Sequence, residues 1–390
     1  AWTNDNTAIN LGVEGVGNIP SFIATAGTTS ETATIVVTPT FTNNGVPCTG
    51  PSETFTITVN PTAQVNEVPI QVLCNNESTD EIVFTTNNTD GTTTYTWTND
   101  NTNTGLGESG DTATIPSFVA TAGTSPEISN ITVTPLYTNN GEECSGPSET
   151  FTITVNPTPT MNSVSAVEVC NGEDITIDFT TSNTGGVTTY DWSAVGPAIG
   201  LAPTSGLVTD SNVDITFTGS NPDPEPRVVT ITVTPIFTND GISCSTSEEQ
   251  TFTITVKPTT NVTDNIDDQF IFTGDTTDAV TIESVTENAT FTWVAVAETG
   301  IEGLENTSGN TSTIPEETLT LAEGINTPLD VVYTITPSAP AAENDNGCPG
   351  NPYTYTVTVN PLAQLNSTQN IVVCDGEDVG PIAFTSTTEG

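Results

Sequence analysis

Apolar and polar residues alternate along most of the chain, and residues 131–157 show this pattern most clearly. In the second half of the segment, Phe151, Ile153 and Val155 occupy alternate positions, and threonines fill the positions between them. A period of two residues is typical of a half-buried antiparallel strand, with one face on a core and the other in water. The pattern therefore predicts two β-strands in this segment, joined by a turn that contains a glycine.

The same segment occurs four times, which makes the chain an array of repeats. Its closing strand recurs at residues 55–61, 151–157, 252–258 and 355–361, and its first strand at 35–39, 131–135, 231–235 and 333–337. Tryptophan follows the same period, because its four copies are 95, 95 and 101 residues apart. A unit of about 100 residues is too long for one turn of a solenoid and suits a β-sandwich that buries its own core.

Domain boundaries are predicted after each closing strand, where a proline ends the strand and a short polar linker follows. The chain then divides into the C-terminal part of one repeat, three complete repeats and the N-terminal part of another, at residues 1–60, 61–156, 157–257, 258–360 and 361–390. We expect these units to lie end to end, since proline stiffens the linkers. We also expect the sequence to be part of a longer protein that continues at both ends. The single candidate for a helix, of one or two turns, is residues 315–323.

The charge of the chain excludes several classes of function. The chain has 48 acidic residues, two basic residues and no histidine, which gives a net charge of −46. Nucleic-acid binding needs clustered lysine and arginine, and an anionic membrane surface would repel this chain. No apolar run approaches the roughly 18 residues of a membrane helix, so no transmembrane segment is expected. The charge is interpreted as keeping a long exposed polymer in solution.

Catalytic sites are equally hard to assemble from these residues. Without histidine, neither a Ser-His-Asp nor a Cys-His arrangement exists. Arg227 and Lys257 are the only two cations that would hold an oxyanion or a phosphate. A pair of carboxylates that hydrolyses glycosides would form a singular constellation, whereas most carboxylates here lie in repeated turns. The expected role is therefore not enzymatic.

The repeated aromatic residues allow two interpretations. Exposed tryptophans line sugar-binding faces in carbohydrate modules, whereas a tryptophan between two sheets belongs to the core. Recurrence at one position in every unit favours the core for the four tryptophans and for the four aromatic residues of the closing strands. The tryptophans are Trp2, Trp97, Trp192 and Trp293, and the closing-strand aromatics are Phe55, Phe151, Phe252 and Tyr355.

Calcium is the one ligand that the sequence leaves to be weighed, because turn carboxylates and backbone carbonyls supply the oxygens that it prefers. The candidate ligands follow the first cysteine of a unit or lie beside the tryptophan strand, and they are Glu173, Asp174, Asp275, Glu377, Asp378, Asp5 and Asp100. None belongs to an Asp-x-Asp-x-Asp-Gly loop, and Asp5 and Asp100 have no counterpart in the third unit. Solvated turn residues are the favoured interpretation, and no cofactor is expected.

Several short strands, a tryptophan in the third strand and two cysteines per unit resemble an immunoglobulin-like sandwich. The sequences VCNGEDI at residues 169–175 and VVCDGEDV at 372–379, the ITVTP strand, and a cysteine before the closing FTITVNP resemble more specifically the PKD-like and Ig-like repeats of Bacteroidota surface proteins. These repeats are best known from giant gliding adhesins of the SprB type. The resemblance covers essentially the whole chain, and it implies secretion to the cell surface by the type IX route, association with the outer membrane, and a long adhesive filament.

Seven cysteines without a Cys-x-x-Cys pair or a histidine do not form a zinc site, and their recurrence indicates disulfides and an oxidising compartment. Two arrangements are open. Within a unit, the pairs are Cys74 with Cys144 and Cys170 with Cys244; across a linker, pairs 26 residues apart are Cys48 with Cys74, Cys144 with Cys170, and Cys348 with Cys374. The resemblance favours pairing within a unit, because single-copy relatives carry both cysteines. Phe272 replaces the first cysteine of the fourth unit, so this pairing leaves Cys348 free and makes residues 258–360 the extensible unit.

Together these features predict an all-β tandem array of immunoglobulin-like (PKD-like) antiparallel β-sandwiches, placed end to end. The predicted role is the structural shaft of a long secreted cell-surface adhesin or filament. The specific case that we expect is an adhesin used in gliding motility. The alternative, from a different class, is a spacer or carbohydrate-binding accessory of a large secreted polysaccharide-degrading enzyme. The expected partners are neighbouring repeats of the same chain, with extracellular surfaces or polysaccharides bound through other regions.

Overall fold

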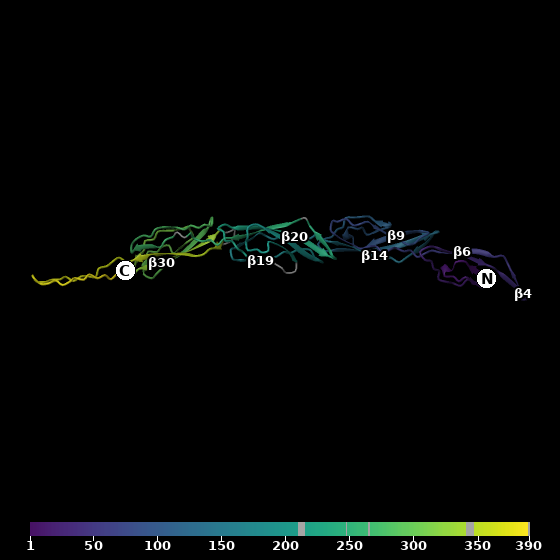
Figure 1. Cartoon of the computed structure of the whole chain (residues 1–390), viewed down its shortest axis with the longest axis horizontal. Helices are drawn as coiled ribbons and strands as arrows, with labels where there is room; N and C mark the ends of the chain where they lie inside the picture. The colour runs from purple at the N-terminus through teal and green to yellow at the C-terminus, as the bar shows by residue number, and fades with distance from the viewer. Residues whose placement is uncertain (210–214, 247, 264–265, 341–346, 389–390) are drawn as a thin grey trace.

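The computed structural model describes residues 1–209, 215–246, 248–263, 266–340 and 347–388. The described chain consists of β-strands, loops and two single-turn 3-10 helices, η1 (Thr7–Ile9) and η2 (Thr102–Thr104). Its units follow one another along a slightly bowed rod, from the purple N-terminal unit to the yellow C-terminal end (Figure 1). The predicted all-β architecture with units placed end to end is confirmed.

The third unit illustrates how one sandwich is assembled. Its strands are β15 (Val167–Cys170), β16 (Asp174–Ile177), β17 (Val187–Val195), β18 (Ser205–Thr209), β19 (Ile215–Thr218), β20 (Arg227–Asn239), β21 (Ile242–Ser245) and β22 (Gln250–Lys257). One sheet has the order β15-β22-β20-β17-β18, and the other is the antiparallel pair β16-β19. Strands β15 and β22 run parallel, and the other pairs described in this unit are antiparallel.

The second and fourth units repeat this arrangement. The second unit contains β7 (Gln71–Cys74), β8 (Ile82–Val83), β9 (Thr92–Asn99), β10 (Ser109–Gly110), β11 (Thr114–Ile115), β12 (Glu127–Asn139), β13 (Glu142–Ser145) and β14 (Glu149–Asn156). The fourth contains β23 (Gln269–Phe272), β24 (Val280–Thr281), β25 (Thr290–Ala297), β26 (Ile301–Glu302), β27 (Ser308–Gly309), β28 (Thr313–Ile314), β29 (Thr320–Leu321), β30 (Leu329–Ala339), β31 (Cys348–Pro349) and β32 (Tyr353–Asn360). The main sheets are β7-β14-β12-β9-β10 and β23-β32-β30-β25-β27.

The two ends of the described chain contain fewer strands than the three units between them. Residues 1–60 form β1 (Trp2–Asn4), β2 (Glu14–Gly15), β3 (Glu31–Val37), β4 (Thr40–Asn43), β5 (Val46–Thr49) and β6 (Glu53–Val59). Four of these strands form a sheet in the order β2-β1-β3-β6, and β4 pairs with β5 as a separate hairpin. In residues 361–388, an isolated bridge joins Leu365 to Ser386.

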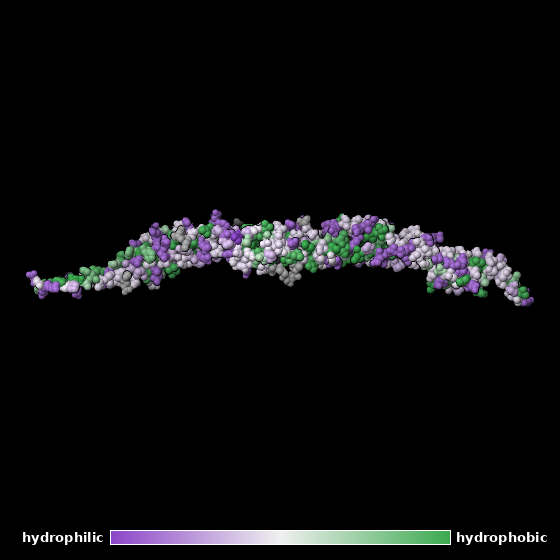
Figure 2. All heavy atoms as spheres, viewed as in Figure 1, coloured by the Kyte–Doolittle hydropathy of each residue, from purple (hydrophilic) through white to green (hydrophobic). Residues whose placement is uncertain are grey.

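Alternation along the strands divides side chains between core and water, as β12 illustrates. Ile131 and Val133 are fully buried, whereas Thr132 and Thr134 on the other face are partly exposed. Buried apolar residues form a separate cluster in residues 1–60 and in each of the second, third and fourth units, so each of these parts has its own core. On the face seen in Figure 2, apolar residues accordingly form small green groups among white and purple ones.

Each tryptophan lies buried in a core and packs on a glycine of the neighbouring strand. The tryptophans Trp2, Trp97, Trp192 and Trp293 are between 3% and 7% exposed, and they face Gly15, Gly110, Gly206 and Gly309. A Cβ atom at Gly110 would lie 2.6 Å from Cε2 of Trp97, which is too close for any side chain. The glycine therefore makes room for the indole ring, which leaves little tryptophan surface for a ligand.

The expectation that all four closing-strand aromatic residues belong to a core was wrong for one of them. Phe151, Phe252 and Tyr355 are buried, but Phe55 is 46% exposed. Residues 1–60 contain no counterpart of Phe84, whose ring lies 6.3 Å from the ring of Phe151 in the second unit.

Residues 315–323, the helix candidate, are extended instead and contribute β29. Glu317 is buried here and acts as an anchor between segments. Its backbone N–H donates to Thr277 Oγ1, and its carboxylate accepts from the N–H groups of Glu305 and Asn306. These contacts with distant segments override a weak local preference for helix.

Candidate functional site: the junctions between units

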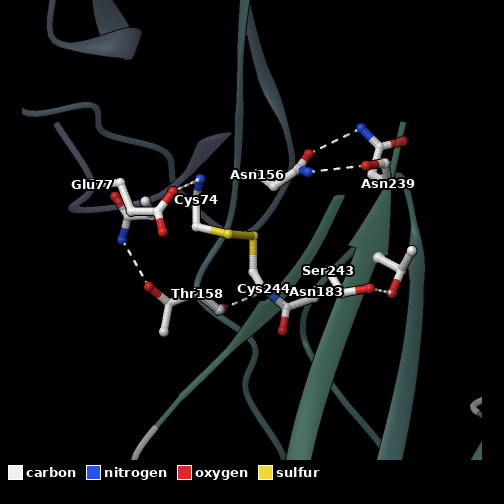
Figure 3. Close-up of a disulfide and its surroundings, with 10 residues drawn as sticks. Cys74, Glu77, Asn156, Thr158, Asn183, Asn239, Ser243 and Cys244 are labelled. Carbon is white, nitrogen blue, oxygen red and sulfur yellow. Dashed lines mark hydrogen bonds between the residues drawn. A yellow bond between two sulfur atoms is a disulfide. The ribbon is translucent and has the colours of Figure 1, made fainter. Parts of the chain in front are cut away.

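Two disulfides join consecutive units. Cys74 of the second unit is bonded to Cys244 of the third, and Cys170 of the third unit is bonded to Cys348 of the fourth. The paired Cα atoms are 5.6 and 5.5 Å apart, which lies within the usual range for disulfides. Figure 3 shows the first bridge with the polar residues around it.

The strand order brings these cysteines to opposite ends of their own unit. Cys74 ends β7, which runs parallel to β14, and it lies beside Asn156 where β14 leaves the unit. Strand β20 continues past its partner β22, and its last residues pair with β21 in a hairpin that places Cys244 opposite Phe237. This hairpin reaches back to the end of the preceding unit, where the disulfide forms.

Both pairing arrangements expected from the sequence are wrong. Cys74 does not pair with Cys144, and Cys170 does not pair with Cys244; the pairs across the linker, 26 residues apart, do not form either. Within a unit, Cys144 lies opposite Tyr137, whereas Cys74 lies beside the end of β14, near Glu127, so ten residues of β12, or about 33 Å, separate the two cysteines. A disulfide needs Cα atoms closer than about 7 Å.

The expectation for the fourth unit is corrected for the same reason. Cys348 is bonded rather than free, and Phe272 occupies the position from which a cysteine would bond the following unit. Phe272 lies opposite Asn360, as Cys74 lies opposite Asn156, so the two positions are equivalent. Residues 258–360 are therefore fastened to the preceding unit and are not the extensible one. Cys48, Cys144 and Cys374 are unbridged.

A pair of asparagines reinforces the junction between the second and third units. Asn156 Nδ2 donates to the carbonyl oxygen of Asn239 at 3.1 Å, and Asn239 Nδ2 donates back to Asn156 Oδ1 at 3.0 Å. Asn156 is fully buried, so these bonds satisfy polar atoms that water does not reach. The same exchange joins Asn60 and Asn139 at the first junction, at 3.2 and 3.1 Å.

The third junction replaces the asparagine with a cation. Lys257 stands beside Cys170, where Asn156 stands beside Cys74. Its side chain is 6% exposed, and Nζ lies 3.1 Å from Glu168 Oε2. The ion pair neutralises a charge that is largely removed from water.

An aromatic side chain fills the space beneath each of the first two junction hairpins. Tyr137 and Phe237 occupy equivalent places and are both fully buried. The Tyr137 hydroxyl donates to the carbonyl oxygen of Thr89 at 2.7 Å and lies 3.2 Å from Ser30 Oγ of the preceding unit. In the fourth unit the smaller Ala339 takes this place, opposite Cys348.

The carboxylates considered as calcium ligands serve the turns that hold the first cysteine. Glu173 Oε2 accepts from the backbone N–H of Cys170 at 2.9 Å, and Asp275 and Glu377 accept in the same way from Phe272 and Cys374 at 3.1 Å. Among the described residues, no group of three or more acidic, cysteine or histidine side chains could hold a metal ion.

The carboxylates beside the tryptophan strand make similar bonds. Asp100 Oδ1 accepts from the backbone N–H of Asn130 at 2.7 Å, and this bond lowers the pKa of Asp100. Asp5 Oδ1 accepts from the N–H of Thr34 at 2.6 Å. These oxygens are therefore engaged in cross-strand contacts.

The sequence contains residues that mark the junctions between units, but sequence reasoning did not recognise them. The closing strand ends in Asn-Pro in three of its four copies, and Asn43, Asn139 and Asn239 precede hairpin turns, but both signals look like ordinary turn residues until the units are stacked. The described part of the chain contains no helix long and apolar enough to cross a membrane.

In comparisons with known proteins, the fourth unit matches a protein family. Residues 263–363 match the model of the PKD-like domain family. Among solved structures, the chain is similar to the EC1-4 fragment of Drosophila N-cadherin, with 16% identity and a TM-score of 0.27, over 93% of this chain and 91% of that one. It is also similar to an I-band fragment of titin (11% identity, TM-score 0.36, 78% of this chain and 100% of that one) and to the human desmocollin-1 ectodomain (11%, 0.30, 89% and 71%). No curated protein matches the sequence.

Proposed function

We propose that this tandem array of PKD-like and immunoglobulin-like sandwiches is a non-enzymatic shaft segment of a long extracellular adhesin or filament on the cell surface. The observation that carries the proposal is the covalent fastening of neighbouring units at Cys74–Cys244 and Cys170–Cys348. Two bridges and the buried asparagine contacts oppose bending at the junctions, whereas interfaces between domains of one chain usually permit motion. A stiff rod suits a part that spans distance and transmits force.

The chemistry of the chain agrees with an extracellular place. Structural disulfides persist in oxidising compartments and are rare in the cytosol. A net charge of −46 keeps a long exposed rod from associating with its copies. The concrete version that we propose is a gliding-type adhesin of a Bacteroidota outer surface, exported by the type IX route and associated with the outer membrane.

The alternative is a spacer or carbohydrate-binding accessory of a secreted polysaccharide-degrading enzyme. The buried tryptophans weigh against the binding version, because Trp97 and Trp192 are 7% and 5% exposed and offer no face on which a sugar ring would stack.

Electron microscopy of the native cell surface, with antibodies raised against residues 61–360, tests the proposal. We expect label along filaments that project from the cell, and loss of both the filaments and surface attachment when the gene is deleted. Label confined to the medium, on a soluble protein that degrades polysaccharide, would replace the shaft with the accessory.

A further inference from the structure

The two disulfides enclose stretches of chain that are longer than one repeat. Cys74 and Cys244 are 170 residues apart, and Cys170 and Cys348 are 178 apart, whereas the period of the array is about 100 residues. Each bridge leaves the end of one unit and enters the hairpin of the next, so it encloses most of two units. Successive closed loops therefore overlap, and residues 170–244 lie inside both.

Overlap changes what a break in the backbone does. A peptide bond inside a disulfide-closed loop can be hydrolysed by a protease and one water molecule without separating the two ends of the chain. Residues 74–170 lie inside the first loop, 170–244 inside both and 244–348 inside the second. No peptide bond between Cys74 and Cys348 is outside a loop.

We propose that the overlapping bridges make the backbone of this rod covalently redundant, so that it stays joined end to end after a single proteolytic cut anywhere between Cys74 and Cys348. The inference rests on the disulfide connectivity and not on the adhesive role proposed above. Exposed loop tips are the preferred sites of proteolysis, and a rod outside the cell presents many of them. A shaft with one peptide path would be severed by the first such cut.

The covalent redundancy ends at Cys348, where the second loop closes. Phe272 takes the place of the cysteine that would carry a bridge from the fourth unit to the next. Residues after Cys348 are therefore outside both loops, and they supply a control segment in the same molecule.

Four exposed glycines make matched positions for a cut. A Cβ atom at any of them would meet no atom within 4 Å, but Gly241 and Gly324 have φ angles of +76° and +92°, so each glycine is kept and a short recognition sequence for a specific protease is inserted after it: Gly107, Gly241, Gly324 and Gly380. Gly107 lies in the first loop only, Gly241 in both, Gly324 in the second only and Gly380 in neither. The full chain carrying one such sequence is cut under oxidising conditions. Its thiols are alkylated to prevent disulfide exchange, and its mass is measured in denaturant.

Cutting at Gly107, Gly241 or Gly324 is expected to leave one species with the mass of the whole chain plus one water, which reductant then splits into two. Cutting at Gly380 should release a fragment without reductant. Separation at any of the first three positions would overturn the proposal. The cut at Gly324 is the most decisive, because bridges closing within units would not hold the chain together there.

Paired substitutions test the overlap itself. With Cys74→Ser and Cys244→Ser together, the cut at Gly107 should separate the chain, while the cut at Gly241 should not. If these substitutions prevent folding, non-reduced peptide mapping of the unsubstituted chain decides the connectivity. Recovery of peptides that join Cys74 to Cys144 would overturn the proposal, and recovery of peptides that join Cys74 to Cys244 would support it.

Discussion

The overlapping bridges also set how far the rod can be stretched, because tension finally follows the shortest covalent path between the ends. From Cys74 this path crosses to Cys244, returns along the backbone to Cys170 and crosses to Cys348. At about 3.5 Å per extended residue, that path measures about 260 Å, and the unbridged backbone from Cys74 to Cys348 measures about 960 Å. Breaking both bridges should therefore lengthen the fully stretched chain by about 700 Å.

Removing the bridges one at a time gives a more specific prediction for the stretched length than removing both together. If only Cys74–Cys244 remains, the path runs from Cys244 to Cys348 and measures about 360 Å; if only Cys170–Cys348 remains, it runs from Cys74 to Cys170 and measures about 340 Å. Each single removal then adds about 100 Å or less, although removal of both adds about 700 Å. This failure of additivity arises because the two loops overlap.

Single-molecule force spectroscopy on the full chain, held by its two ends, measures these lengths. The comparison needs the oxidised protein, the Cys74→Ser/Cys244→Ser pair, the Cys170→Ser/Cys348→Ser pair and all four substitutions together. Cys144→Ser is the matched control, since Cys144 is unbridged and its loss should leave the length unchanged. If the bridges closed within units, the first pair of substitutions would remove both and add about 500 Å, while the second pair, and Cys144→Ser alone, would each remove one and add about 250 Å; those lengths would refute the reasoning.

Three further outcomes are expected. Gly110→Ala should destabilise the second unit by about 1–3 kcal/mol in calorimetry, because its methyl group would overlap the ring of Trp97, whereas Gly107→Ala, with nothing within 4 Å, should change little. Burial raises the pKa of Tyr333 to about 12 and also raises that of Tyr355, so the fourth unit should keep its stability below the unfolded-state pKa of about 10 and lose it as the pH rises towards 12. Tyr333→Phe should flatten that loss in a pH series of melting curves. Chelation with EDTA at fixed ionic strength should leave the melting temperature unchanged, because the turn carboxylates accept backbone hydrogen bonds; a fall of several degrees would contradict this account.

The alternation of apolar and polar residues was sufficient to predict the long strands of the second, third and fourth units and their inner faces, although not the short β29 or the exposure of Phe55. Ile131 and Val133 are buried because a period of two puts them on one side of β12, and this relation is local. The glycine beneath each tryptophan was missed. Ser-Gly dipeptides follow Trp97, Trp192 and Trp293, but a glycine in a strand has several explanations until its neighbour across the sheet is known.

The disulfide pairing could not be predicted because the chain consists of repeated units. Every unit offers the same two cysteine positions, so the sequence specifies which positions meet only up to a shift by whole units. The structure selects Cys74 with Cys244 because the parallel strand β7 carries one cysteine to the exit of its unit, while the extension of β20 carries the other to the entrance of the next. Parallel pairing of a short first strand leaves no mark in the hydrophobic pattern, and this pairing decides where the bridge forms.

Phe272 shows how a single substitution can divide such an array. The turn that follows it keeps the same geometry, since its N–H donates to Asp275 Oδ2 as the N–H of Cys74 donates to Glu77 Oε2. The strand also keeps its register, opposite Asn360. The substitution therefore removes the bridge and leaves the fold of the unit intact. Phe272 is 54% exposed, so the fourth unit ends in an apolar side chain where the second and third units each carry a bonded cysteine.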